Sequence, residues 1–396
     1  MKSKVEQDQI SKIYTKSVCL LLSTIVELKN VNKKAWEKAL RSAGTEGTLF
    51  QSSYWADYLK TVYKDQPIFI ASLNRKGDIQ ALLLAIESCY AKHPTFNATT
   101  KRHILFSHLY KNALLPIFQK MLPYIVWENG PIILPNFRDK PEKVAMYRDI
   151  IQKIIQKAKE ERCYSLAFVR PAFFSDQPSL LSSLDFEKKR MGTILVNLKQ
   201  PLDVLRKQVD RKDRNKFEKT EKRMQIERVR NKADLRLLYY MHLENQRRSN
   251  RTIRPFSLYS SLWDYFSPKD KIEGFVAYYD GRLVGSILYL NHNLKAHLYA
   301  LGDSDFARLN RVPVLGALFW HTIKYTRERA FEYLDLSGIE LHKIDAGESK
   351  ALGIFRFKSK FGGQLVEYHD YRKTLRSSKT VNILNCFLSE GEGRHN

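Results

Sequence analysis

The chain has 396 residues, and its 67 Lys and Arg residues outnumber the 42 Asp and Glu residues, giving a net charge of +25. A hydrophobic content of 43% excludes wholesale disorder, and the length indicates about two domains. The surplus charge favours a polyanionic partner, namely nucleic acid, an anionic membrane surface or a phosphorylated substrate, although solubility or genomic composition could also account for it.

The N-terminal region reads as a charged, helical extension over residues 1–45. Its longest apolar run, 18–26, is shorter than the ~20 residues that span a bilayer, and no small-x-small cleavage site follows it. We expect a buried helix there and a cytoplasmic protein. The four cysteines form no CxxC pair, which indicates a reducing compartment; they are Cys19, Cys89, Cys163 and Cys386.

The N-terminal half of the chain alternates strand and helix patterns, while residues 91–122 fit neither. Alternating apolar positions, turn residues and helical spacing define the segments. The predicted elements are a strand end and helix over 48–60, paired strands at 69–73 and 79–86 around Lys76-Gly77-Asp78, a strand at 125–134 interrupted by Gly130-Pro131, a helix at 141–160, and a strand at 165–169 closed by Arg170-Pro171.

The C-terminal half repeats the mixture in a clearer order. The predicted elements are a strand at 193–198, helices within 201–223 and 232–248, strands at 275–279 and 283–290 around the hairpin signal Asp280-Gly281, a strand at 296–301, a helix at 313–329 with Pro313 in its first turn, and a strand at 333–336. This mixture predicts an α+β protein. The strand–strand–strand–helix–strand order of 273–337 resembles the GNAT acyltransferase fold.

The loop before the predicted helix 313–329 bears on the donor. Acetyl-CoA users of the GNAT fold carry a Gly-rich loop there, whose bare N–H groups bind the pyrophosphate. The corresponding segment, 307–313, contains no glycine. This argues against ordinary CoA binding while leaving the fold unaffected.

Motifs for hydrolysis, metal binding and nucleotide binding are missing: the sequence has no GxSxG, HExxH, P-loop or GxGxxG. His103 and His108 are five residues apart, as are His292 and His297. Neither spacing puts both rings on one face of a helix or of a strand. We therefore interpret these histidines as non-ligands and predict no metal site.

A basic segment, 206–232, carries twelve Lys and Arg residues against five acids. One interpretation is a solvated helix pair with i,i+4 salt bridges such as Glu218 to Lys222. The excess of positive charge, together with the arginines that follow at 247, 248, 251 and 254, favours a surface that binds a polyanion.

Six segments, in order from about residue 48 to 372, resemble the FemABX aminoacyltransferases that form peptidoglycan bridges. They are FQSSYW (50–55), WENGPIIL (127–134), LAFVRPAF (166–173), TILVNL with KDRNKFEKTEKR (193–198 and 212–223), the stretch 302–340 with a D-x-x-G-I strand, and GIFRFKSKFGGQLVEY (353–368). The long coiled-coil arm of some members of the family is absent. Departures from its helix pattern occur at Glu218, Thr220 and Met224, and they bear on the acceptor more than on the fold.

The resemblance implies two GNAT-like domains side by side, with mixed sheets flanked by helices. Domain 1 and the extension would occupy 1–188. Domain 2 would occupy 189–396, with the option that its last strand, 364–372, returns to domain 1.

The resemblance also implies an activity: transfer of an aminoacyl group from aminoacyl-tRNA to an amine of an anionic cell-envelope precursor of the peptidoglycan type. The acceptor would be nucleotide- or lipid-linked, and the protein peripheral to the inner membrane leaflet in the second case. No cofactor is expected beyond aminoacyl-tRNA as co-substrate, with acetyl-CoA less favoured. The alternatives are an acyl-CoA-dependent N-acyltransferase and a non-catalytic RNA- or membrane-binding protein of the same fold.

By resemblance, Phe357 and Lys358 match the family's Phe-Lys pair in the closing motif. Lys358 would place positive charge at the tRNA terminus or the developing oxyanion, and Phe357 would shape the channel. A double glycine at 362–363 would turn the chain into its last strand. The alternative is that Lys358 extends along the surface from a helix end.

Further residues predicted to bind substrate are Trp55, Lys60, Arg214 and Arg356. Arg214 matches a helix arginine of the family, and Lys60 lies one residue later than the family's lysine. Both could equally be surface charges. No side chain stands out as a general base.

Overall fold

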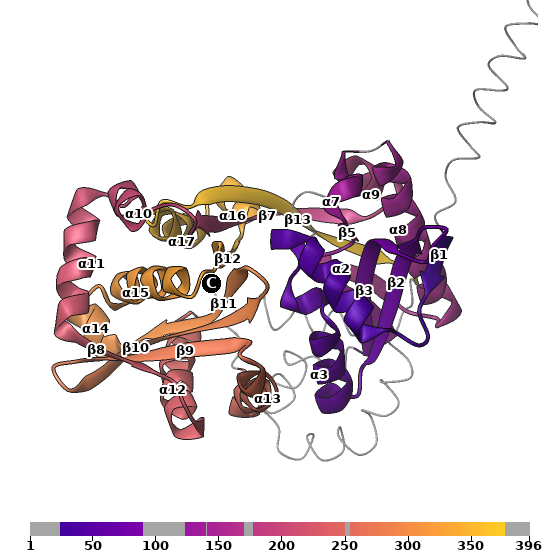
Figure 1. The fold of residues 1–396 in the computed structure, drawn as a ribbon. Helices are drawn as coiled ribbons and strands as arrows, with labels where there is room; N and C mark the ends of the chain where they lie inside the picture. The colour runs from indigo at the N-terminus through magenta and orange to yellow at the C-terminus, as the bar shows by residue number, and fades with distance from the viewer. Residues whose placement is uncertain (1–23, 90–122, 140, 170–176, 250–253, 377–396) are drawn as a thin grey trace, which may run out of the picture.

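The computed structural model describes residues 24–89, 123–139, 141–169, 177–249 and 254–376. Their strands form one mixed sheet with the order β1-β2-β3-β4-β6-β13-β7-β12-β11-β10-β9-β8, and β5 pairs separately with β3. Figure 1 shows the two halves of the chain lying side by side, each with helices against its part of the sheet.

The elements of the N-terminal half are β1 (Thr24–Glu27), α2 (Lys33–Ser42), η1 (Gly44–Glu46), η2 (Leu49–Gln51), α3 (Ser53–Tyr63), β2 (Gln66–Leu73), β3 (Ile79–Cys89), β4 (Pro123–Glu128), β5 (Ile132–Ile133), α7 (Pro135–Arg138), α8 (Glu142–Glu160), β6 (Ser165–Val169) and α9 (Pro178–Ser183). The 3-10 turns are marked η. Helix α8 packs on β2, β3 and β6.

The elements of the C-terminal half are β7 (Glu187–Asn197), α10 (Leu202–Gln208), α11 (Arg211–Arg223), β8 (Met224–Arg228), α12 (Lys232–Arg248), α13 (Phe256–Phe266), η5 (Ser267–Lys269), β9 (Ile272–Tyr279), β10 (Arg282–His292), β11 (Lys295–Asp303), α14 (Asp305–Leu309), α15 (Val314–Glu328), β12 (Tyr333–Ile339), α16 (Leu341–Asp345), α17 (Ser349–Ser359) and β13 (Gln364–Thr374).

Strand β13 joins the two halves. It pairs antiparallel with β7 from Gln364 to Arg372, and with β6 from Tyr371 to Thr374. Figure 1 shows it in yellow, running from beside α17 across to the N-terminal half. The predicted boundary between residues 188 and 189 falls inside β7, and this division of the chain remains a prediction.

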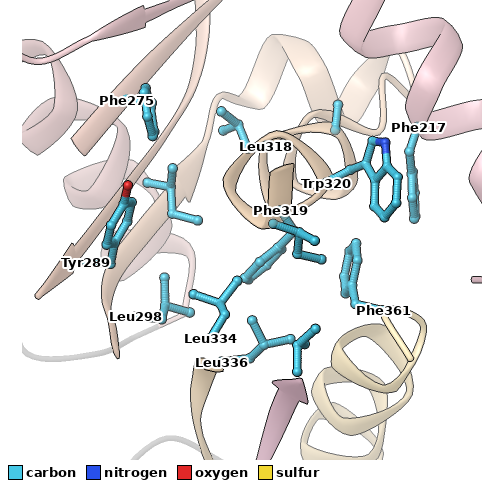
Figure 2. Packing of buried hydrophobic residues seen from close by; sticks show 14 of the residues in the cluster. Phe217, Phe275, Tyr289, Leu298, Leu318, Phe319, Trp320, Leu334, Leu336 and Phe361 are labelled. Atoms are coloured by element: carbon cyan, nitrogen blue, oxygen red, sulfur yellow. The ribbon is translucent and has the colours of Figure 1, made fainter. Parts of the chain in front are cut away.

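The core of the C-terminal half lies between α15 and the sheet. Figure 2 shows Phe319 reaching from α15 toward Leu334 of β12, with Phe361 beside it and Phe217 farther out, next to Trp320. The ring centroid of Phe361 is 5.0 Å from that of Phe319 and 5.6 Å from that of Phe217. Each buried Phe contributes roughly 1.5–3 kcal/mol, so this cluster fixes α11 and the end of α17 on the central helix.

The other face of the same sheet is covered partly by the N-terminal half. Leu49 and Phe50 of η2 and Tyr58 of α3 belong to one buried cluster with residues of α12, α13 and β10. The Tyr58 hydroxyl lies 3.1 Å from Oγ of Ser261 on α13. The FQSSYW segment therefore packs the N-terminal half onto the C-terminal half.

Most predicted elements are confirmed. The structure contains the predicted strands at 69–73, 79–86 and 165–169 and the predicted helices at 141–160 and 232–248. The strand predicted at 125–134 occurs as two strands, β4 and β5. The strand–strand–strand–helix–strand series of 273–337 is also present, with Pro313 as the N-cap of α15. The turn at Asp280 and Gly281 has the positive φ angles of a tight hairpin, 49° and 73°.

Several predictions were wrong. Residues 24–27 form an edge strand rather than a helix, because they pair with β2, and 49–51 form a 3-10 turn rather than a strand end. The basic segment is broken after α10, since Asp210 caps α11 by accepting from Lys212 N at 2.9 Å. Strand β8 and helix α13 were missed.

Some predictions fall outside the described residues: those on 1–23, 91–122, Arg170-Pro171, His103, His108, Arg251, Cys19 and Cys386. Cys89 and Cys163 are buried. None of the helices in the described ranges combines the length and apolarity needed to cross a bilayer.

Candidate active site

Strands β11 and β12 pair side by side only briefly. They run parallel and are connected through α15, and their register covers Lys295–His297 opposite Tyr333–Asp335. Beyond that point β11 continues along β10, and β12 continues along β7. Ligands commonly bind outside the carboxyl ends of parallel strands whose neighbours diverge, so this point of separation is a candidate ligand site.

An Asp–His pair, with a buried carboxylate and a partly buried imidazole, lies at the last register position before the strands separate. Nδ1 of His297 is 3.1 Å from Oδ2 of Asp335. The other carboxylate oxygen of Asp335 accepts from Thr193 Oγ1 at 2.6 Å and from Ser337 N at 2.8 Å. Asp335 is 1% exposed. The carboxylate is therefore fixed on several sides, and it orients the imidazole through one ring nitrogen.

The ammonium group of Lys358 lies next to this pair, at a bulge in β12. The register of β12 against β7 shifts between Asp335 and Gly338, and Ser337 has a φ of +67°. Nζ of Lys358 donates to the carbonyl oxygens of Ser337 and Gly338, at 3.1 Å each. The lysine is 8% exposed, so its side chain points inward from α17 instead of extending along the surface.

Phe357, its predicted partner, lies on the apolar side of α17. Its ring centroid is 5.7 Å from that of Phe319 and 5.6 Å from that of Phe361. Gly362, with a φ of +70°, turns the chain after α17. A Cβ atom on Gly363 would lie 2.4 Å from Cγ2 of Ile194, so close packing on β7 requires glycine there.

The remaining predicted site residues are scattered. Trp55 stacks on Phe266 at 5.8 Å between the two halves of the chain. Lys60 is exposed in the last turn of α3. Arg214 donates to the carbonyl of Arg206 at 3.1 Å, and Arg356 is exposed on α17. Helix α3 lies in the N-terminal half, apart from α11 and α17 (Figure 1), so Lys60 is separated from the two arginines. Helices α11 and α17 are neighbours at one end, where Asp213 pairs with Lys360.

The sequence interpretation of His292 and His297 was wrong in its geometry. The hairpin between β10 and β11 places His292 opposite Lys295, and Leu290 opposite His297, so both imidazoles face the same side of the sheet. There they line a cavity of about 10 Å³ under Thr48 and Phe50 of η2, which is the space of about one water molecule. The prediction from the five-residue spacing failed because it assumed that both histidines lie on the same strand, whereas His292 is on β10 and His297 is on β11.

His292 is buried, and neither of its ring nitrogens has a hydrogen-bond partner among the described residues, although Nε2 lies 4.0 Å from Oε2 of Glu37. Burial first, and then the nearby charges of Lys271, Lys295 and Arg41, lower its pKa to about 3. The imidazole is therefore neutral at physiological pH. Within the residues that the structure describes, no group of three or more His, Cys, Asp or Glu side chains is arranged to hold a metal ion.

Sequence reasoning missed Thr193, His297 and Asp335. The D-x-x-G-I pattern contained a usable signal, because its first position is Asp335 and its fourth is Gly338. The pattern names no partner for that carboxylate, however. His297 and Thr193 come from two other strands, 38 and 142 residues away along the chain.

The basic helix α11 does not form the salt bridge expected between Glu218 and Lys222. The carboxylate of Glu218 instead accepts hydrogen bonds from Nε and Nη2 of Arg206 on α10. Hydrogen bonding from Arg206 lowers the pKa of Glu218 more than its partial burial raises it. The lysines of α11 are thus left with fewer acidic partners than i,i+4 pairing predicts.

Comparison with known proteins gives the same architecture. Residues 205–358 match the model of the acetyltransferase (GNAT) domain family. The solved structure of FemX superposes with a TM-score of 0.62 at 14% identity, covering 91% of this chain and 99% of that one. No curated protein matches the sequence.

Two further solved structures are more distant. A tandem GNAT protein from the clavulanic acid biosynthesis pathway has a TM-score of 0.47 at 9% identity, covering 90% of this chain and 99% of that one. L-PGS from Bacillus licheniformis has a TM-score of 0.45 at 12% identity, covering 69% and 83%.

The protein therefore has the tandem GNAT fold seen in FemX, which confirms the α+β class and the FemABX-type architecture. The domain match and the fold support an acyltransferase.

Proposed function

We propose that this protein transfers an aminoacyl group from charged tRNA to an amine of an anionic cell-envelope precursor of the peptidoglycan type. The reaction would take place where β11 and β12 separate. The observation that carries the proposal is the arrangement of His297, Asp335 and Lys358 at that point. It combines an oriented imidazole with a fixed cation, on the fold of FemX.

The chemistry needs a proton acceptor and positive charge. The amine attacks the ester carbonyl of the aminoacyl group, a C–N bond forms, and the carbonyl oxygen becomes an oxyanion. His297, oriented by Asp335, takes the proton that the amine loses. The C–O bond to the ribose then breaks, and the same imidazole returns the proton to the leaving oxygen.

In this scheme the ammonium group of Lys358 stabilises the oxyanion. Two backbone carbonyls hold its ammonium group at the bulge, so little reorganisation is needed when negative charge develops. A preorganised cation or donor of this kind is worth about 3 kcal/mol in a site that excludes water. Phe357 packs against the core beside it and limits the conformations of α17.

Charged tRNA as the donor is supported by the surface of α11. Of its cations, Arg211, Lys212, Lys216, Lys219 and Lys222 are exposed and have no acidic partner among the described residues. Neighbouring basic residues are partly neutralised, as Lys360 pairs with Asp213 at 2.7 Å. A row of unpaired cations suits phosphate contacts. Arg214, Arg356, Lys60 and Trp55 remain proposed substrate contacts.

An acyl-CoA-dependent N-acyltransferase of envelope or polysaccharide biosynthesis is the second candidate, favoured by the match to the acetyltransferase domain family. The loop before α15 counts against it. That loop folds as α14, capped by Ser304 and followed by Arg311 with a φ of +53°, and it lacks the glycines of a pyrophosphate nest.

The test is acyl transfer by the purified protein to an amine-bearing peptidoglycan peptide precursor, offered with radiolabelled aminoacyl-tRNA or with acetyl-CoA. We expect transfer from aminoacyl-tRNA alone. Lys358→Met should lower the rate about 100- to 1000-fold, and the matched control Lys360→Met should leave it unchanged. Transfer from acetyl-CoA alone would establish the second candidate, and equal rates for the two variants would remove Lys358 from the mechanism.

A further inference from the structure

A second concave site lies on the C-terminal half, away from the separation of β11 and β12. A groove of about 610 Å³ runs between α10, α11, β8 and α15. This volume lies within the range of small-molecule sites, roughly 300–1,000 Å³. Figure 1 shows α11 and α15 on the side of this half that faces away from the N-terminal half. Of the residues that line this groove, the acyl-transfer proposal uses only Lys222, as one of the exposed cations of α11.

The walls of the groove are largely apolar. Four residues supply them: Leu202 of α10, Met224 and Ile226 of β8, and Trp320 of α15. Met224 and Trp320 are continuous with the buried core, so this wall is rigid. It offers hydrocarbon and indole surface to an apolar body.

A charged triad lies on one side. Oε1 of Glu221 is 3.2 Å from Nδ1 of His321 and 2.7 Å from Nζ of Lys324. Burial alone would raise the pKa of Glu221, but the hydrogen bonds from His321 and Lys324 outweigh it and lower the pKa below its ordinary value. The carboxylate thus stays ionised and fixes one nitrogen of the imidazole.

The other nitrogen of His321 is available to a ligand. The ring packs edge-on against Phe275, with centroids 4.9 Å apart. Its Nε2 atom has no hydrogen-bond partner among the described residues, although His321 lines the groove. An imidazole whose Nδ1 is fixed by a carboxylate presents Nε2 as a defined polar group.

The charge balance of the groove identifies the kind of ligand. Arg206 is paired with Glu218, and Lys324 with Glu221. Lys222, exposed on the rim, has no acidic partner in the described ranges. The groove therefore carries one uncompensated positive charge beside an apolar wall.

We propose that this groove binds a small amphiphile with a single anionic group, such as a carboxylate or sulfonate, on an apolar body. The apolar body lies against Trp320 and Ile226, and the anionic group pairs with Lys222. The ring of His321, whose Nε2 is an acceptor when Nδ1 donates to Glu221, lies beside the bound ligand. The groove shares Lys222 with the surface proposed to bind tRNA, but its ligand class does not depend on the acyl-transfer proposal.

The experiment uses the full chain and 8-anilinonaphthalene-1-sulfonate, which combines one sulfonate with an aromatic body. We expect saturable fluorescence enhancement with one site per chain. Lys222→Glu should weaken binding about tenfold, equivalent to about 1.4 kcal/mol. Lys219→Glu is the matched control, because Lys219 is an exposed lysine of α11 that does not line the groove, and it should leave the affinity unchanged.

Two further arms test the anionic group and the histidine. Octanoate should displace the dye, whereas octanol at the same concentration should not. Ligand addition should also shift one histidine ring signal in the NMR spectrum, identified by its loss in His321→Gln. The proposal is overturned by equal effects of the two charge reversals, by competition from octanol equal to that from octanoate, by an unperturbed His321 signal, or by the absence of saturable binding.

Discussion

Nδ1 of His297 lies 3.1 Å from Oδ2 of Asp335 at the last register pair of β11 and β12, where the two parallel strands begin to separate. The carboxylate is buried and the imidazole is partly buried, on a sheet face that is partly covered by η2 of the N-terminal half. Phe50 contacts the imidazole edge-on at 5.4 Å. An oriented imidazole is thus formed by parts of both halves of the chain.

If this pair acts as a unit, its two members should not contribute independently. His297→Gln and Asp335→Asn should each lower the rate of acyl transfer about 100-fold. The double variant should be about as slow as either single variant, because Asp335 acts through the imidazole. Steady-state rates of the four proteins form the cycle, and circular dichroism checks the fold. Losses that multiply in the double variant would contradict a shared role.

Two helical glycines should respond oppositely to alanine. A Cβ atom on Gly316 of α15 would lie 2.2 Å from the ring of Phe217, whereas one on Gly353 of α17 meets nothing within 4 Å. Gly316→Ala should lower the free energy of unfolding by about 1–3 kcal/mol through overpacking. Gly353→Ala should raise it by about 0.5–1 kcal/mol through helix propensity. Urea denaturation measures the free energy of unfolding of both variants. Equal changes would show that α11 moves to accommodate the added methyl group at no cost.

His292 predicts a specific pH dependence of stability. Its pKa is about 3 in the folded protein, lowered by burial first and then by nearby cations, against an ordinary value of 6.5. Protonation therefore favours the unfolded chain, and the stability that neutral His292 provides is present above pH 6.5 and lost as the pH falls toward 3. Each pH unit in that window costs about 1.4 kcal/mol.

The comparison is with His292→Leu, which removes both unpaired nitrogens. Between pH 7 and pH 5 the wild-type free energy of unfolding should fall by about 2 kcal/mol more than that of the variant. Urea titrations at the two pH values provide the difference, and other groups cancel because both proteins contain them. Parallel pH profiles would mean that His292 is hydrated or paired in solution.

The exposed cations of α11 should determine the salt dependence of tRNA binding. Lys212→Glu with Lys216→Glu should weaken binding and make the slope of log affinity against log salt shallower by about 2, one unit for each lost phosphate contact. Filter binding at several salt concentrations measures the slope. The controls are charge reversals at Lys33 and Lys232, two lysines that pair with Asp57 and Asp264. An unchanged slope would place the RNA elsewhere.

The sequence by itself determined the local elements of the C-terminal half. Alternation and the Asp280-Gly281 turn predicted β9, β10 and β11, and helical spacing after Pro313 predicted α15, because these signals depend on residues a few positions apart. The order of these elements was enough to indicate the GNAT fold, and the closing motif indicated the position of Lys358.

Only the tertiary structure decided which side chains meet. His297 and Asp335 are 38 residues apart, and Lys358 is 21 residues from the carbonyl that it binds at Ser337. Such contacts depend on strand register and on a bulge in β12, and a shift of one residue would turn each side chain to the other face. The hairpin that places His292 and His297 on one face shows the same dependence. Spacing along the chain carries no information about register between strands, so the site could be assembled only from the folded sheet.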